Sequence, residues 1–365
     1  MLSKYAWLLA IALSCTGCVS LRADEAELLP DRLQRLAGRY GICDAAIAVV
    51  RKRELQSVDA VHNCAAPAAD SVFEAASLSK PVFAYAVLKL VQQGRMDLDA
   101  PVLDYLPQGY RHRHFPHLAE SPIDQVTDSR LRGVTVRMAL NHTSGLPNWS
   151  GGPLAFEGQP GTWQYSGEGY VLLQRAVEAV AGENLDAFMQ RTVFAPLKMS
   201  HSAYTRQAWL EPALVPATGY YGNTLAPVPF REPVAAFSLY TSASDYGRFL
   251  AALLRDERTL QQIVESPVPA SAKLDLDWGL GWGLERNRGD VFLWHWGNNA
   301  GYRAFVMASP RTGDGYVMFT NSDKGQVLAE PLGAAVLPGP HQVYRYHLLR
   351  DGLANLLCET LDICP

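Results

Sequence analysis

The sequence has few charged residues and no stretch rich in lysine or arginine. Of its 365 residues, 19% are charged and 48% hydrophobic, and the formal net charge is -4. Because nucleic-acid-binding surfaces concentrate basic side chains, this composition argues against a nucleic-acid partner. The sequence also has no internal repeat and no low-complexity linker. We therefore expect one large domain, or two closely joined ones, with apolar residues enough for a large core.

The sequence has no apolar run long enough to form a stable helix across a bilayer. The most apolar stretch near the N-terminus is residues 5–13, which follow Lys4 and precede small residues. This layout is typical of a secretory signal peptide, which we place at residues 1–18. Thr-Gly-Cys resembles a lipoprotein signal with a lipid on Cys18, although Cys15 stands where an aliphatic residue is usual; plain cleavage is the alternative. Either way we expect export to the periplasm, with a membrane anchor if Cys18 is lipidated.

Cysteine is scarce, and four cysteines remain beyond the signal. In an oxidising compartment an even number indicates disulfides, with three possible pairings. The segments on either side of residues 53–54 look like two strands of a hairpin, and a register with Lys52 opposite Leu55 would place Cys43 opposite Cys64. The other two cysteines, Cys358 and Cys364, would then close a small loop. Four free buried thiols are the alternative.

Histidine is also scarce, with nine in the chain, and three of them lie close together. His112, His114 and His117 flank Pro116 in a polar segment. Their spacing fits no standard zinc pattern, and no carboxylate or thiol is placed to complete one. We therefore expect no metal and no other cofactor. The segment is interpreted as a solvated loop that covers a cleft.

Strand patterns occur at both ends of the chain and helical patterns in the middle. We predict strands at 44–52, 55–63, 290–297, 301–310 and 315–322, and helices at 80–94, 167–182, 184–197, 242–256 and 341–358. The simplest closure is an α/β fold of the α+β type. It has a five-stranded antiparallel sheet flanked by helices, with a mostly helical insertion beside it. Within one unit at 25–365, the sheet subdomain would be about 25–95 and 270–365, and the helical subdomain about 96–269.

Ser77 and Lys80 lie three residues apart, where a polar segment gives way to an apolar periodic one. Both fall at the start of a predicted helix and share one face. The helix dipole and burial would lower the pKa of the lysine, and a partly neutral lysine can take the serine proton. The backbone N–H of Ser77 would be an oxyanion donor. Since Ser-x-x-Lys is a short motif, the alternative is that Ser77 caps the helix beside a solvated lysine.

Two later stretches favour a reactive Ser77. "WQYSGEGY" places Tyr165 in a loop before a helix, and "LWHWGNNAGY" places His295 and Gly297 on a predicted strand. With these motifs in this order, the chain from about Leu33 to Asn321 resembles the serine-reactive family of class C β-lactamases, DD-peptidases and family VIII esterases. The resemblance implies a β-lactamase/transpeptidase-like fold. The predicted arrangement of strands and helices itself places the expected site in a cleft between the sheet and the helical insertion.

The resemblance also implies roles for individual residues. Ser77 would be the acylated nucleophile, and Lys80 and Tyr165 would move protons, with the choice of base left open. A tyrosine base would need its pKa lowered by the charge of Lys80. The backbone N–H of Asn298 would be the second oxyanion donor. Gly297 would let a substrate lie close along the strand edge.

The chain departs from the family pattern at three positions. Gly167 stands where an asparagine usually binds the amide of a substrate. His295 holds a positive charge poorly at neutral pH, and it either shares in catalysis or only orients Tyr165. Trp296 is bulky where a small residue is common. These departures weaken the case for an efficient β-lactamase. With Gly297 and Asn298, Gly167 and Trp296 make up the expected substrate-binding positions.

Four further residues near these motifs have open interpretations. His142 and Ser144 are expected to hold a loop near the site. Trp149 and Trp163 either line the acyl pocket or belong to the core.

The expected function is therefore that of an exported serine hydrolase that acts through an acyl-enzyme on esters or D-amino-acid peptides. The alternatives are a penicillin-binding DD-carboxypeptidase-like or sensor protein with low turnover, or a weak β-lactamase. A lipoprotein that binds a partner without chemistry would leave the Ser-Lys-Tyr set unexplained.

Overall fold

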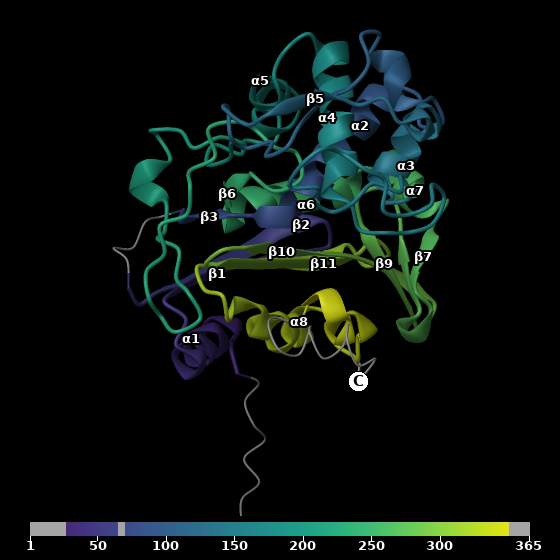
Figure 1. Cartoon of the computed structure of the whole chain (residues 1–365). Helices are drawn as coiled ribbons and strands as arrows, with labels where there is room; N and C mark the ends of the chain where they lie inside the picture. The colour runs from purple at the N-terminus through teal and green to yellow at the C-terminus, as the bar shows by residue number, and fades with distance from the viewer. Residues whose placement is uncertain (1–26, 65–69, 350–365) are drawn as a thin grey trace, which may run out of the picture.

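The computed structural model describes residues 27–64 and 70–349. One antiparallel sheet runs through the molecule, with helices on both faces (Figure 1). Its strand order is β2-β1-β12-β11-β10-β9-β8-β7. The strands are β1 (Asp44–Arg51), β2 (Glu54–His62), β7 (Val268–Ser271), β8 (Leu276–Trp278), β9 (Gly283–Asn287), β10 (Asp290–Asn299), β11 (Tyr302–Ser309) and β12 (Asp314–Thr320).

The expected antiparallel sheet flanked by helices is confirmed, but it has eight strands and not five. The five expected strands are β1, β2, β10, β11 and β12, and they form one end of the sheet. Strands β7 to β9 extend the other end and contain four, three and five residues. Strands this short show too little alternation of apolar and polar residues to be recognised in the sequence.

The hairpin of β1 and β2 differs by one residue from the predicted register. Its turn residues are Lys52 and Arg53, which both have positive φ angles, so that Arg51 faces Glu54. Such a two-residue turn suits the twist of a hairpin. The register shifts again at a bulge beside Val49 and Val50. Cys43 and Cys64 nevertheless form a disulfide, with 5.1 Å between their Cα atoms, as expected.

Helices cover the sheet on both faces (Figure 1). Helices α1 and α8 pack on one face, and α6 packs on the other, against β1, β2 and β12. The helices are α1 (Leu29–Tyr40), α2 (Ser79–Gln92), α3 (Val136–Leu140), α4 (Gly167–Ala181), α5 (Leu185–Met189), α6 (Ala243–Arg255), α7 (Glu257–Val264) and α8 (Ala329–Val336). The helix predicted at 341–358 is wrong in its described part, where residues 342–345 and 347–349 form short 3₁₀ turns. Within the described ranges no helix is long and apolar enough to cross a membrane.

Both faces of the sheet are buried, and successive residues of a strand enter different cores. Along β1, Ile47 and Val49 belong to the core under α1 and α8, whereas Ala48 and Val50 belong to the larger core that contains α2. This alternation follows from the pleat of a strand. Helix α2 is buried at every position from Ser79 to Leu88, as expected for a helix that is apolar on all sides.

Two shorter strand pairs lie beside the main sheet. β3 (Val72–Glu74) pairs with β6 (Tyr240–Ser242), and β4 (Arg111–Arg113) pairs with β5 (Ile123–Gln125). β3 leads directly into the turn before α2, so this pair fixes where α2 begins.

Several sequence predictions concern residues outside the described ranges. The signal peptide at residues 1–18, lipidation of Cys18 and the pairing of Cys358 with Cys364 are in this group. The division into sheet and helical subdomains also stays a prediction.

Candidate active site

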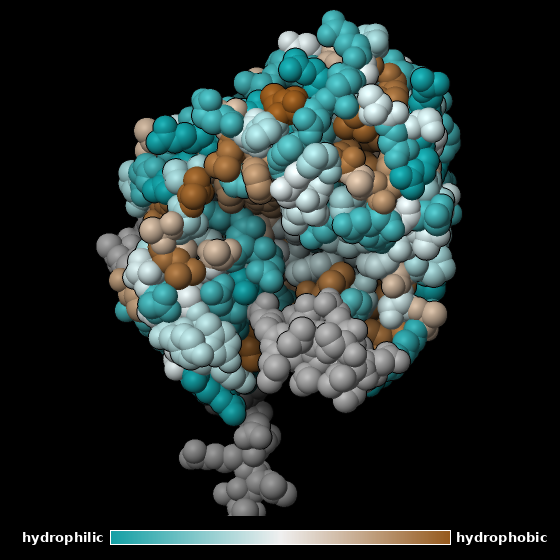
Figure 2. Space-filling model, viewed as in Figure 1, coloured by the Kyte–Doolittle hydropathy of each residue, from teal (hydrophilic) through white to brown (hydrophobic). Residues whose placement is uncertain are grey.

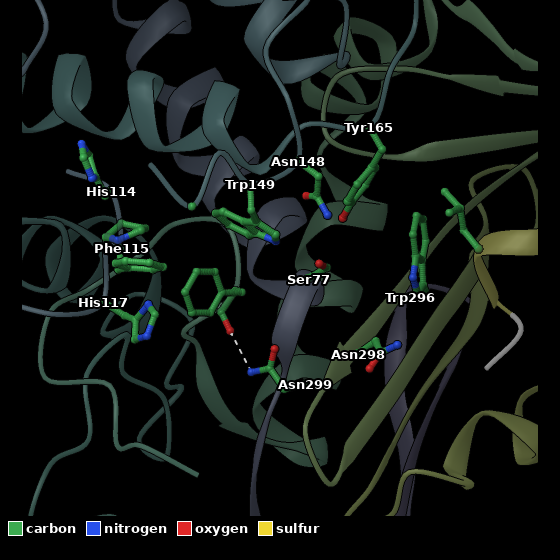
Figure 3. A pocket seen from close by; sticks show the side chains of 14 residues that line it. Ser77, His114, Phe115, His117, Asn148, Trp149, Tyr165, Trp296, Asn298 and Asn299 are labelled. Carbon is green, nitrogen blue, oxygen red and sulfur yellow. Dashed lines mark hydrogen bonds between the residues drawn. The ribbon is translucent and has the colours of Figure 1, made fainter. Parts of the chain in front are cut away.

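Ser77 lies in a short 3₁₀ turn, Ala76–Leu78, between β3 and α2. Ala76 has a φ angle of 49°, in the left-handed region that residues with a side chain rarely adopt. Strain of this kind is common next to reactive side chains. No side-chain oxygen caps the start of α2, so Ser77 does not act as a helix cap here. Instead its side chain lines a cavity of about 510 Å³ (Figure 3).

Lys80 is completely buried in the first turn of α2. Its Nζ donates to Ser77 Oγ at 3.1 Å and to the carbonyl oxygen of Ala236 at 2.9 Å. The same atom lies 4.7 Å from the ring centre of Tyr165 and 5.6 Å from that of Tyr170. Burial lowers the pKa of Lys80 from its usual 10.5 to about 7. A substantial fraction of Lys80 is therefore neutral at neutral pH, as a proton acceptor for Ser77 must be.

Tyr165 reaches the cavity from the loop that precedes α4 (Figure 3). Its hydroxyl is buried and has no hydrogen-bond partner among the described residues. Burial raises the pKa of Tyr165 above its usual value, and the nearby Ser77 offsets part of this rise. The pKa of Tyr165 is therefore not lowered, as a tyrosine base would need, because desolvation by burial is the largest cause of its shift. The phenol stays protonated at neutral pH, which favours Lys80 over Tyr165 as the base.

His295 lies on β10 and is buried behind the cavity wall. Its Nδ1 donates to the backbone carbonyl of Trp296 at 2.9 Å, and its Nε2 has no partner within the described ranges. Burial, together with the charge of Lys80, lowers the pKa of His295 to about 3. The imidazole is therefore neutral, so this position supplies no fixed positive charge. Its ring lies 6.3 Å from that of Tyr165.

Trp296 points into the cavity, and its ring lies 4.9 Å from that of Tyr165. Beyond it, Gly297 lets β10 pass close to the turn that carries Ser77. A Cβ at Gly297 would come within 2.4 Å of the carbonyl oxygen of Ala75. A glycine is thus required here by the protein's own backbone, and the expected approach of a substrate at Gly297 stays a prediction.

The two edges of β10 are paired by other strands over different lengths. β9 pairs only with residues 290–294, whereas β11 pairs with residues 293–299. In the described part of the chain, no strand pairs with the other edge of residues 295–299. Asn298 and Asn299 lie on this segment and line the cavity together with Ser77 (Figure 3). The donor role expected for the backbone of Asn298 stays a prediction.

Gly167 is buried at the start of α4 and does not line the cavity. Its backbone N–H donates to Asn148 Oδ1 at 3.1 Å. A Cβ at this position would lie 2.5 Å from the indole ring of Trp149 and 2.6 Å from the carbonyl oxygen of Asn148. The substrate-binding position expected at Gly167 is therefore covered by Asn148 and Trp149, which do line the cavity. Asn148 was missed in the sequence, where only its place after "HTSGLP" could have indicated it.

The structure also shows where the two tryptophans and the His142 loop lie relative to the cavity. Trp149 lines the cavity, whereas Trp163 packs against Trp278, with 5.8 Å between their ring centres. His142 Nδ1 accepts the backbone N–H of Ser166 at 3.0 Å, and its ring lies 4.4 Å from that of Tyr165. His142 thus holds the loop that carries Tyr165. Ser144 accepts from the backbone of its own loop, at Leu146.

The histidine-rich segment also borders the cavity, from His114 to His117. His112 is buried and contacts Glu168 at 3.0 Å, and His114 pairs with Asp124. Among the described residues, no group of three His, Cys, Asp or Glu side chains is placed to hold a metal ion. The segment therefore forms one wall of the cavity.

The cavity has no charged wall. Its described lining residues include no Asp, Glu, Lys or Arg. The surface is hollowed between the helices and the end of the sheet, as Figure 2 shows. The carboxylate of Glu74 contacts one lining residue, because it accepts from Asn299 Nδ2 at 2.8 Å. Burial raises the pKa of Glu74 to about 7, so it titrates in the same range as Lys80.

Comparison with known proteins agrees with this site. The family model described as Beta-lactamase matches residues 29–338. Penicillin-binding protein 4* of Bacillus subtilis is 28% identical over 262 residues, which cover 60% of this chain and 53% of the relative. Esterase EstB of Burkholderia gladioli is 30% identical over 200 residues, which cover 45% of each protein. The chain spans about half the length of these curated relatives.

Solved structures show the same fold. The D-alanine carboxypeptidase AmpC from Burkholderia cenocepacia has a TM-score of 0.69 and 17% identity, over 84% of this chain and 97% of that one. A D-stereospecific amidohydrolase from Streptomyces has a TM-score of 0.63 and 21% identity, over 82% and 97%. The chain therefore belongs to the beta-lactamase family, a family of serine hydrolases.

Proposed function

We propose that the protein is an exported hydrolase that forms an acyl-enzyme on Ser77 and acts on esters or D-amino-acid peptides. The observation that carries the proposal is the contact of 3.1 Å between Lys80 Nζ and Ser77 Oγ at the cavity. Lys80 is buried, and its pKa is lowered to about 7. A neutral amine beside a serine hydroxyl is the arrangement that nucleophilic catalysis needs.

The proposed reaction has two halves. In the first, Ser77 Oγ attacks the acyl carbon and gives its proton to neutral Lys80. The C–O or C–N bond to the leaving group then breaks, and that group takes a proton through Tyr165, whose hydroxyl is buried and protonated. In the second half, water attacks the acyl carbon and gives a proton to the same residues, and the bond from that carbon to Ser77 Oγ breaks. Ser77 takes back a proton, and the acid is released. The net change is hydrolysis of one bond.

The uncharged cavity supports neutral substrates. A substrate with a free carboxylate next to the scissile bond needs a cationic partner, and His295 is neutral at neutral pH. Simple esters and peptides without a free terminal carboxylate meet no unpaired charge in this cavity. The names of similar proteins include an esterase, a D-stereospecific amidohydrolase and penicillin-binding proteins, which is compatible with either class of bond.

A penicillin-binding sensor or weak β-lactamase is the second candidate. It is favoured by Gly167, where the amide side chain of the family pattern is missing, and by the neutral His295. Such a protein would acylate Ser77 and release the product over hours. Its acyl-enzyme would accumulate, whereas a hydrolase would turn over many times.

Export is part of the proposal. The disulfide between Cys43 and Cys64 supports an oxidising compartment. The N-terminal sequence supports a signal peptide with a lipid on Cys18. Metabolic labelling with a fatty acid, with and without the substitution Cys18→Ala, tests the anchor. Equal labelling of both proteins would refute it.

The test of the function combines a label and a substrate panel. A fluorophosphonate should label the wild type and the exposed-site control Ser200→Ala, but not Ser77→Ala. Phenyl esters, a D-Ala-D-Ala peptide and nitrocefin then give the specificity of each protein. Equal labelling of Ser77→Ala would overturn the proposal. Labelling without turnover of any substrate would favour the sensor.

A further inference from the structure

We infer that the cavity beside Ser77 is built to bind a flat aromatic acyl group. The preferred substrates would then be esters or amides of arylacetic-type acids, with Asn148 donating to a polar atom of the acyl part. The inference rests on the proposed function, since it names the substrate class of the same site. It is carried by three observations: the space taken by Trp149, the arrangement of the aromatic wall and the orientation of Asn148.

Trp149 occupies the space that a side chain at position 167 would need. A Cβ on Gly167 would lie 2.5 Å from the indole, so the ring can take this place only because residue 167 is a glycine. Where the family pattern has an amide side chain, this chain therefore has an aromatic surface. Replacing an amide by an indole exchanges a hydrogen-bonding subsite for one that binds flat apolar groups.

The aromatic wall continues from Trp149 across the cavity. The rings of Trp149 and Phe237 are perpendicular, with their centres 5.1 Å apart. The ring centre of Phe237 lies 5.7 Å from that of His117. Phe115 completes this wall. Trp149 and Phe115 remain 41% and 42% exposed, so the protein does not bury them itself. Large exposed aromatic side chains that line a cavity beside a nucleophile indicate a subsite for an apolar group.

The position of the wall indicates which part of the substrate it contacts. In Figure 3, Tyr165 and Trp296 lie on one side of Ser77, whereas Trp149, Phe115 and His117 lie on the other. The leaving group must lie near the proton donor, which is the hydroxyl of Tyr165. The acyl group therefore extends in the opposite direction, toward the aromatic wall.

Asn148 supplies a directed donor at this wall. Its Oδ1 accepts the backbone N–H of Gly167 at 3.1 Å, which fixes which end of the amide is oxygen. Its Nδ2 has no partner among the described residues, and Asn148 lines the cavity. The amide can therefore donate to a carbonyl or ether oxygen of the acyl group. The lack of charged lining residues makes charged acyl groups unfavourable.

The first experiment compares phenyl esters that share one leaving group: acetate, cyclohexylacetate and phenylacetate. Rates are corrected for the intrinsic reactivity of each ester. We expect kcat/KM for phenylacetate to exceed that for acetate by about tenfold or more, the range that pocket contacts provide. Phenylacetate should also exceed cyclohexylacetate, which has similar bulk but is not flat. An acetate preference in the wild type would overturn the inference.

Substitutions test whether the aromatic wall causes the preference for phenylacetate over acetate. Trp149→Ala should lower the ratio of phenylacetate to acetate about tenfold, and Trp149→Phe should restore most of it. Gly167→Ala should also lower the ratio, because its Cβ displaces the indole. The matched control is Gly38→Ala, where nothing lies within 4 Å of the added Cβ, and this variant should keep the ratio. An unchanged ratio in Trp149→Ala would refute the inference.

A binding measurement separates this inference from the proposed function. Ser77→Ala should bind phenylacetamide in calorimetry more tightly than cyclohexylacetamide, and the added substitution Trp149→Ala should abolish this difference. If this binding is observed but the wild type turns over no ester, the function is wrong and the subsite stands. If Ser77-dependent turnover shows no aromatic preference and phenylacetamide does not bind, the subsite is wrong and the function stands.

Discussion

Helix α2 carries two lysines nine residues apart that meet opposite environments. Lys89, near its C-terminal end, is partly exposed and pairs with Asp256 at the N-terminus of α7. Lys80, in the first turn, is completely buried and donates only to the neutral oxygens of Ser77 and Ala236. Burial lowers the pKa of Lys80 to about 7. The same side chain thus serves as a structural ion-pair partner at one end of the helix and as a candidate base at the other.

The two lysines differ in what they contribute to stability and to catalysis. An ion pair near the surface contributes little to folding and nothing to proton transfer. A buried ammonium without a carboxylate destabilises the fold. The same desolvation lowers the pKa of the ammonium, so that part of the amine is neutral and can accept a proton at neutral pH. The two lysines should therefore respond in opposite ways to the same substitutions.

The largest expected difference is in activity. Lys80→Arg keeps a positive charge but cannot release its proton, so kcat/KM for phenyl acetate should fall by at least about 10³-fold. Lys89→Arg should stay within about twofold of the wild type, because Lys89 does not line the cavity. Circular dichroism would confirm that both variants fold. Comparable losses in the two variants would show that Lys80 is not the base.

The second difference is in stability, where Lys80→Met should be more stable than the wild type. The pKa of Lys80 falls from 10.5 to about 7 on folding, which corresponds to a penalty on the order of 5 kcal/mol below pH 7. Lys80→Met removes this penalty but also the hydrogen bonds to Ser77 and Ala236. We expect a net gain of about 2 kcal/mol in the free energy of unfolding at pH 6. Urea titration of both proteins measures it.

The sign of the pH dependence provides a check on that gain. Between pH 7 and 10.5 the unfolded chain holds the Lys80 proton that the folded protein has lost. The wild type therefore gains stability as pH rises through this window. The advantage of Lys80→Met should be largest below pH 7 and shrink toward pH 10. An advantage that does not change with pH would mean that Lys80 keeps its usual pKa.

The sequence could predict the helix and the motif but not the difference between the two lysines. Ser77 and Lys80 were found because both lie in the first turn of a periodic segment. The burial of Lys80 depends on Ala236, Tyr165 and Tyr170, which come from distant parts of the chain. No local pattern reveals such contacts. The raised pKa of Tyr165 follows from the same enclosure.

The sheet also contains strands that the sequence alone could not predict. The long strands β1, β2 and β10 to β12 were predicted because each has seven or more residues, enough to display a pattern. The short strand β9 pairs with the edge of β10, and β8 and β7 then pair in turn with β9 and β8. Asn148 was missed for a similar reason, since its contact with Gly167 spans 19 residues and a loop.

The next prediction concerns how kcat/KM of the wild type depends on pH. If neutral Lys80 is the base, kcat/KM for phenyl acetate should rise about tenfold from pH 6 to pH 8. It should then stay level, because Tyr165 remains protonated. Glu74 also has a pKa of about 7, so Glu74→Gln is the control. Loss of the inflection in Glu74→Gln would assign the rise to that carboxyl and not to Lys80.

The smallest expected effect is at Lys89. Lys89→Met removes the pair with Asp256 but leaves that carboxylate its contacts with the backbone and side chain of Thr259. Because Lys89 is 25% exposed, solvent screens the pair, and we expect a loss below about 1 kcal/mol in urea titration. High salt should reduce this loss further. A gain in stability like that of Lys80→Met would contradict the comparison, because it would mean that burial does not distinguish the two lysines.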